Sequence, residues 1–180
     1  MADYLNVFKR YEKKYMLSIP QYLALRDGVS GHMLVDQYGQ HTICNIYMDS
    51  PDYRLIRASI QKPAYKEKLR LRSYGVVPKN GDVFLELKKK YKGEVFKRRI
   101  CLPYSQAQLY LTHGIRPAQD SQILKEIDYF MRFYKPVPQV YIAYERIAMF
   151  APQIEGLRIT FDQNIRFRTN PLDLSANPWG

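Results

Sequence analysis

Residues 65–74 read YKEKLRLRSY, and this stretch decides the fold that we expect. Side chains alternate between the two faces of a β-strand, so residues two positions apart share a face. By that rule four basic residues share one face and two leucines the other: Lys66, Lys68, Arg70, Arg72, and Leu69, Leu71. The stretch therefore predicts a strand with an apolar face for a core and a strongly basic opposite face.

The flanking sequence repeats this alternation. Residues 82–91 and 94–102 flank Lys92-Gly93, which predicts a hairpin. In its first strand Glu86, Lys88 and Lys90 lie opposite the apolar positions. Further strands are expected at residues 6–17, 41–49, 139–150 and 157–168. Polar and charged residues also share a face in three other expected strands. These sets are Arg10, Glu12 and Lys14 in the first strand, Tyr144 and Arg146 in the strand at 139–150, and Arg158, Thr160 and Asp162 in the last strand.

Short helices are expected between the strands. Ser18 and Gln21 form a capping-box pattern that opens a helix reaching Asp27. Ser50-Pro51 predicts a helix start for a segment ending near Gln61. Two more helices are expected at residues 105–113 and 121–134, the latter with apolar residues at helical spacing. Seven strands with peripheral helices predict an α+β fold built on an antiparallel β-barrel or tunnel, with residues 1–180 as a single domain.

The charge composition limits the classes of binding partner that we expect. Lys and Arg number 28 against 17 Asp and Glu, a net charge of +11. Such an excess favours a nucleic acid, an anionic membrane surface or a phosphate-rich ligand. Cys44, Cys101 and the histidines show no metal-ligand spacing. No secretory segment follows Met1, and the longest uncharged run, residues 102–115, is too short and polar to span a bilayer. We therefore expect a cytoplasmic protein without a membrane segment.

The basic faces have two interpretations. Each could be the solvated side of an antiparallel sheet, which is common. A solvated face usually mixes signs, however, whereas here bases far outnumber acids, and the few acids beside them suit a metal and phosphate site. If the barrel closes with these faces inward, its lumen requires an anion, and it is lined by the following bases: Arg10, Lys14, Lys68, Arg70, Arg72, Lys88, Lys90, Arg146 and Arg158.

Six short motifs occur in an order that carries a resemblance. They are RYEKKY at 10–15, NIYMDS at 45–50, KLRLR at 68–72, FLELK at 84–88, YER at 144–146 and LRITFD at 157–162. Together they resemble the VTC domain, the polyphosphate polymerase branch of the triphosphate tunnel metalloenzymes in the CYTH-like superfamily. The resemblance implies a closed antiparallel tunnel lined by Lys and Arg. It also implies ATP and polyphosphate as ligands, Mn²⁺ or Mg²⁺ as cofactor, and transfer of the γ-phosphate to a growing polyphosphate chain.

The resemblance also assigns roles to residues. The bases expected to grip the reacting phosphates are Arg70, Arg72, Lys88, Arg146 and Arg158. Lys14 and Lys97 match further basic positions, although Arg98 and Arg99 adjoin Lys97. Strand alternation adds Arg10, Lys68 and Lys90 as phosphate contacts. The metal candidates are Glu12, Glu86 and Asp162.

One departure separates this sequence from the family pattern. That pattern continues with a strand bearing a metal-binding Glu in a Glu-x-Lys context and then a helix, and neither follows Phe167. We therefore expect either a C-terminally incomplete domain or an open-barrel variant, with tunnel closure, metal binding and turnover affected more than anion binding. An open sheet edge would also allow a homo-oligomer.

Three alternatives remain open. A tunnel-type triphosphatase would carry Glu-x-Glu-x-Lys on the first strand, where this chain has Arg10 in first place. A non-catalytic polyphosphate-binding module would need the same bases. A nucleic-acid-binding β-barrel could stack bases on the 16 Tyr and 8 Phe, but no RNP or KH signature is found, so we expect no nucleic-acid partner.

Overall fold

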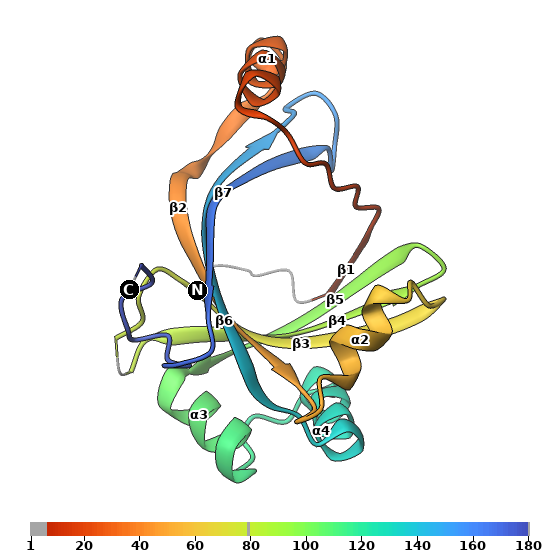
Figure 1. The fold of residues 1–180 in the computed structure, drawn as a ribbon, viewed down its shortest axis with the longest axis vertical. Helices are drawn as coiled ribbons and strands as arrows, with labels where there is room; N and C mark the ends of the chain where they lie inside the picture. The colour runs from red at the N-terminus through yellow and green to blue at the C-terminus, as the bar shows by residue number, and fades with distance from the viewer. Residues whose placement is uncertain (1–6, 79, 180) are drawn as a thin grey trace.

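The central element of the molecule is an antiparallel sheet (Figure 1). The structure is a computed structural model that describes residues 7–78 and 80–179. The sheet has seven strands in the order β1-β5-β4-β3-β2-β6-β7: β1 (Val7–Arg10), β2 (Leu34–Asp49), β3 (Tyr65–Tyr74), β4 (Asp82–Tyr91), β5 (Glu94–Pro103), β6 (Val137–Phe150) and β7 (Arg158–Arg168). Four helices accompany it: α1 (Ile19–Val29), α2 (Arg54–Ile60), α3 (Tyr104–His113) and α4 (Gln122–Tyr134). The expected α+β class is confirmed.

The sheet curves strongly, as Figure 1 shows, but it is not closed by strand pairing within the described residues. β1 and β7 are its two edges. On β7, Ile165 and Phe167 are 64% and 77% exposed. The closed tunnel is therefore not seen, and the expected self-association through an open edge stays a prediction. Residues 169–179 contain turns but no strand.

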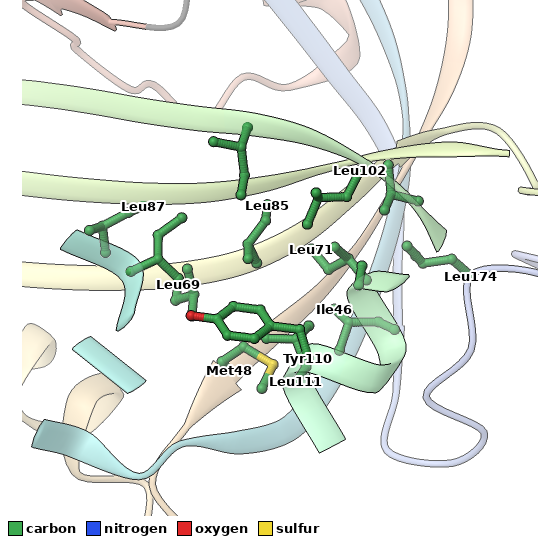
Figure 2. Packing of buried hydrophobic residues seen from close by; sticks show 14 of the residues in the cluster. Ile46, Met48, Leu69, Leu71, Leu85, Leu87, Leu102, Tyr110, Leu111 and Leu174 are labelled. Carbon is green, nitrogen blue, oxygen red and sulfur yellow. The ribbon is translucent and has the colours of Figure 1, made fainter. Parts of the chain in front are cut away.

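The main core lies on the convex side of β3, β4 and β5, where α3 and α4 pack (Figures 1 and 2). Leu69, Leu85 and Leu87 are fully buried there, each contributing about 2 kcal/mol by leaving water. Their partners come from both helices, including Tyr110 of α3 and Ile127 of α4. The leucine face predicted for residues 65–74 is thus the core face, which leaves the basic face on the concave side.

A second, smaller cluster packs against α1. Its buried members are Met33, Ile147, Met149, Ala151 and Phe161. Tyr22 of α1 meets the Phe161 ring edge-on with 5.0 Å between centroids, yet α1 itself has no buried residue. An apolar cavity of about 270 Å³, lined in part by Val29, Met33 and Ala151, adjoins this cluster. The ends of β2, β6 and β7 near α1 are therefore packed separately from the main core.

Three segments differ from expectation. The first strand ends at Arg10 instead of residue 17, because Arg10 pairs with Val95 and its partner β5 begins at Glu94. Glu12 and Lys14 therefore do not share a strand face with Arg10. In contrast, β2 starts at Leu34, seven residues before the expected position, across a register shift that contains Gly39 in the left-handed region (φ 56°).

The start of α2 is the third difference. The helix begins at Arg54, and Ser50 is not its N-cap residue. The Asp49 carboxylate accepts hydrogen bonds from the backbone N–H groups of Leu55 and Ile56 at 2.8 and 2.9 Å. Ser50 Oγ accepts one from the N–H of Arg54 at 2.9 Å. Side chains before the helix thus satisfy its first donors from outside the helical turn.

Candidate functional site

The register of the sheet collects basic side chains on one face. Residues directly opposite each other on antiparallel strands share a face. Arg70 lies opposite Glu86, which lies opposite Arg99, and Lys68 lies opposite Lys88, which lies opposite Lys97. We define the basic face as the concave positions Lys66, Lys68, Arg70, Arg72, Lys88, Lys90, Lys97, Arg99 and Arg146. All of the basic positions predicted on β3 and β4 are among them.

Glu86 is the centre of the basic face. Only 1% of this residue is exposed, and Oε2 lies 2.7 Å from Arg70 Nη2 and 3.8 Å from Arg72 Nε. Lys97 Nζ forms an ion pair with Oε1. Burial raises the pKa of Glu86, but the positive charges of Arg70, Arg72 and Lys97 outweigh burial and hold that pKa at about 2. Glu86 is therefore ionised and fixes three cations in place.

Lys97 is buried beside the same charged groups, but in its case burial is the dominant influence and favours the uncharged form. Burial lowers its pKa to about 7. Glu86 opposes that shift, while the like charges of Arg72 and Arg70 add to it. Lys97 is thus a base whose charge changes near neutral pH, in contrast to the arginines around it.

Arg70 and Arg72 are also held from the neighbouring strands. Arg70 Nη1 donates to the Tyr47 hydroxyl at 2.9 Å. Arg72, 4% exposed, donates to Asn45 Oδ1 at 2.9 Å and to the Tyr144 hydroxyl at 3.0 Å. Burial raises the pKa of Tyr47, but the charge and hydrogen bond of Arg70, together with the charges of Arg72 and Lys68, outweigh burial and the net shift is downward. A continuous polar network therefore crosses β5, β4, β3, β2 and β6.

The bases predicted on β6 and β7 lie at the end of this network and beyond it. The Arg146 guanidinium sits 5.2 Å from the centre of the Tyr144 ring. Arg146 also donates two hydrogen bonds to the Asp162 carboxylate, at 2.6 and 2.7 Å. Arg158 is the first residue of β7 and lies opposite Phe150, four residues from Asp162. Its side chain is 54% exposed and lies 3.3 Å from Asp36. The structure brings Arg146 to the network but not Arg158.

The segment after β1 reaches the other end of the basic face. Glu12 Oε2 accepts a hydrogen bond from Lys88 Nζ at 2.9 Å, and Lys14 lies 3.6 Å from the same carboxylate. Lys14 remains 83% exposed. Burial, Lys66, Lys14 and Lys88 lower the pKa of Lys68, which Tyr47 partly opposes. Lys90 lies on the same face between Lys66 and Val95, whereas the side chain of Arg10 falls outside the described part of the chain.

The three predicted metal candidates do not come together. Glu86 lies under Arg70 and Arg72, Asp162 is bound by Arg146, and Glu12 is bound by Lys88. Within the described residues, no group of three His, Cys, Asp or Glu could hold a metal ion. These carboxylates therefore do not fit a divalent metal site made of protein ligands alone, although the resemblance to the tunnel metalloenzymes implies such a metal.

Sequence reasoning missed several partners of the basic face. Asn45, Tyr47 and Tyr144 orient Arg70 and Arg72. Alternation in NIYMDS would have placed Asn45 and Tyr47 on one face, which is the signal that could have found them. The ambiguity around Lys97 is also resolved: Lys97 and Arg99 lie on the basic face, whereas Arg98 points to the convex side, 3.2 Å from Glu126.

Comparisons with known proteins identify a matching family model and similar solved structures. A model of the VTC domain matches residues 9–179, and no curated protein matches the chain. A putative adenylate cyclase from Bacillus halodurans is similar in structure, with 13% identity, a TM-score of 0.52, and coverage of 88% of this chain and 80% of that chain. A putative adenylyl cyclase from Hippeastrum, described as having a dominant triphosphatase activity, has 17% identity, a TM-score of 0.45, and coverage of 87% and 70%. None of the helices in the described residues is long and apolar enough to cross a membrane.

Proposed function

This chain belongs to the VTC domain family, in the triphosphate tunnel superfamily, and we propose that its basic face transfers the γ-phosphate of ATP to a growing polyphosphate chain. The observation that carries the proposal is the excess of cations around Glu86. One buried carboxylate contacts Arg70, Arg72 and Lys97, and further bases surround that group. A concentration of positive charge on a concave face favours a polyanionic ligand.

The arginines are held in place by their neighbours, and this suits phosphate binding. Glu86, Tyr47, Asn45 and Tyr144 use only part of the five donors that each guanidinium carries. The remaining donors can form charge-assisted bonds to nonbridging phosphate oxygens. Because the side chains are already oriented, less conformational entropy is lost when the ligand binds. Glu86 acts in this proposal as a positioning residue and not as a metal ligand.

The transfer itself asks little covalent chemistry of the protein. A terminal oxygen of the acceptor polyphosphate attacks the γ-phosphorus, the bond between that phosphorus and the β–γ bridging oxygen breaks, and ADP leaves. Arg70, Arg72, Lys88 and Arg146 stabilise the negative charge on the transferred group and hold donor and acceptor in line. Mn²⁺ or Mg²⁺ would neutralise further phosphate charge when bound.

A triphosphatase is the second candidate, because water could replace the acceptor phosphate on the same face. Tunnel hydrolases use paired glutamates on the first strand to hold metals that activate water, whereas Arg10 occupies the first of those positions here. This substitution favours polymerisation over hydrolysis.

Incubation with ATP and Mn²⁺, followed by gel analysis of the products, tests the proposal. Phosphate chains longer than triphosphate are expected, and Arg72→Ala should abolish them. Release of inorganic phosphate without longer chains would instead show a triphosphatase. ATP binding without any turnover would show a polyphosphate-binding module, and failure to bind ATP or polyphosphate would refute the basic face as a phosphate site.

A further inference from the structure

Three aromatic residues adjoin the basic face at the end where β3 terminates. We define the aromatic corner as His41, Tyr74 and Phe84. Phe84 lies directly opposite Arg72, and Tyr74 follows Arg72 by two positions on the same strand face. His41 lies opposite Arg146. The aromatic corner therefore shares the concave face with the arginines.

The rings contact one another and the arginines. The Tyr74 ring meets Phe84 edge-on at 5.6 Å and His41 at 6.0 Å between centroids. On the other side of Phe84, the Arg99 guanidinium lies 4.8 Å from its ring centre. Phe84 is 6% exposed whereas Tyr74 is 50% exposed. Phe84 thus supports Tyr74 from within, and Tyr74 keeps much of its surface accessible beside Arg72 and Arg99.

An accessible aromatic ring next to phosphate-binding arginines matches the two parts of a nucleotide. Every nucleobase has a π-face that stacks on aromatic side chains, independently of its sequence identity. Two residues along a strand span about 6.6 Å, which is of the order of the separation between a base and its phosphates. An inorganic phosphate chain has no ring that could stack on Tyr74, so the accessible π-face of Tyr74 would have no ligand if polyphosphate alone were bound.

We propose that the aromatic corner binds the base of the donor nucleotide, with Tyr74 stacked on the ring and the triphosphate running over Arg72 toward Glu86. This inference rests on the proposed function, because it requires the triphosphate to lie on the basic face. It divides the concave face into two parts: a base subsite that only the donor uses, and a phosphate subsite that donor and product share. The stacking is sequence-tolerant, so nucleoside triphosphates as a class, with little selection among bases, are the expected donors.

Binding of ATP and of inorganic tripolyphosphate to a set of variants, measured by titration calorimetry, separates the two subsites. Stacking contributes about 1–3 kcal/mol per base, and about 1.4 kcal/mol is tenfold in affinity. Tyr74→Ala should therefore weaken ATP binding by about fivefold or more and leave tripolyphosphate binding unchanged. Tyr74→Phe keeps the ring and should bind both like the wild type. Tyr129→Ala is the matched control, since Tyr129 is 61% exposed on α4, on the outer side of the sheet.

The outcomes are distinct for the two proposals. Equal loss of both ligands in Tyr74→Ala, or no loss of either, would overturn the base subsite while tripolyphosphate binding still upholds the phosphate site. Arg72→Ala should weaken both ligands together, which reports on the phosphate subsite alone. If the wild type binds neither ligand, both proposals fail. Because Tyr74 is half exposed, its variants should retain the wild-type melting temperature, and this measurement confirms that each is folded.

Discussion

The two faces of β3, β4 and β5 both hold carboxylates among cations, but in different proportions. On the convex face Lys89 lies 3.0 Å from Glu126 and 3.7 Å from Glu67, and Arg98 lies 3.2 Å from Glu126. Acids and bases are matched there, and the pairs hold α4 on the sheet. On the concave face one carboxylate, Glu86, contacts Arg70, Arg72 and Lys97 at the centre of a larger group of bases.

This difference separates a structural ion-pair cluster, on the convex face, from a candidate binding site, on the concave face. Both faces contain several charges, so the number of charged residues does not separate them. The concave face is distinguished by positive charge that its own acids do not neutralise, and which a ligand can neutralise instead. Substitutions at matched residues on the two faces test this distinction.

Glu86→Gln should have the largest effect on the fold. It removes a buried carboxylate that contacts three cations, and loss of one partner from a buried ion pair costs about 3–5 kcal/mol. We expect a corresponding fall in the free energy of unfolding, measured by urea denaturation. Added tripolyphosphate should restore more stability to this variant than to the wild type, because the ligand replaces the missing negative charge.

Glu126→Gln on α4 is the control for that prediction. Its side chain is 17% exposed and has Lys89 and Arg98 beside it, so we expect a loss of only about 1 kcal/mol. Tripolyphosphate should not rescue it. Equal losses in the two variants would mean that the two faces are both structural, and the comparison would fail.

Lys68→Met should weaken binding without weakening the fold. Lys68 has Lys66, Lys14 and Lys88 as neighbours, and its removal relieves repulsion in the ligand-free protein. Loss of one charge-assisted contact corresponds to about 1.5–3 kcal/mol, so tripolyphosphate affinity should fall about tenfold or more. Lys89→Met on the convex face should do the reverse, lowering the melting temperature and leaving affinity unchanged. A drop in melting temperature for Lys68→Met would contradict the idea that the basic face is built with surplus charge.

The pH dependence of binding should depend on Lys97. Its pKa is near 7 in the folded protein and about 10.4 in an unfolded chain, so the unfolded chain holds more protons between these values. Ligand-free stability should therefore rise from pH 7 to 10, owing to this residue. Anion binding requires the charged form, so affinity for tripolyphosphate should fall by up to about tenfold between pH 6 and 9.

Lys97→Arg isolates that contribution. A guanidinium stays charged throughout this range, so the variant should lose the part of the pH dependence that Lys97 causes. Comparing variant and wild type at each pH cancels the ionisation of the ligand itself. Identical pH profiles for the two proteins would show that Lys97 does not titrate in this range.

The smallest effect is expected from duplex DNA. The bases lie on a concave face within a sheet of seven strands, and a duplex about 20 Å wide is too large to reach the centre of such a curved sheet. Duplex DNA at equal phosphate concentration should therefore leave tripolyphosphate binding unchanged in a competition titration. Displacement of tripolyphosphate by DNA would favour the nucleic-acid alternative.

Much of the fold could be predicted from local sequence pattern. The strand at residues 65–74 has the predicted bounds, and the capping box of Ser18 and Gln21 is present at the start of α1. The capping box depends on contacts within one segment, and the strand is marked by the alternation of side chains within one segment. The end of β1 could not be predicted in this way, because it is set by where β5 begins. The cap that Asp49 forms on α2 is likewise made by a residue before the expected start.

The sequence predicts which residues form the basic face, but not what each of their side chains contacts. Alternation placed Arg70, Arg72 and Lys88 on one face, and the register confirms that they share it. Whether a carboxylate such as Glu86 meets a metal or a cation depends on its cross-strand neighbours, which the sequence does not display. Arg158 shares the pattern of Arg146 but lies at the start of β7, where Asp36 is within reach. The register between β6 and β7 therefore decides which of these arginines lies beside the network.

Because the small cluster beside α1 packs separately from the main core, the amide hydrogens at the two ends of β2 should exchange with solvent at different rates. The end around Ile46 and Met48 belongs to the main core, so its amide hydrogens should exchange only when the whole domain unfolds. The end that starts at Leu34 depends on the smaller cluster, against which α1 buries no residue fully. It should open first and exchange within a shorter time. Because Arg146 pairs with His41 at this looser end, a bound phosphate chain should slow exchange there before any other part of the molecule responds.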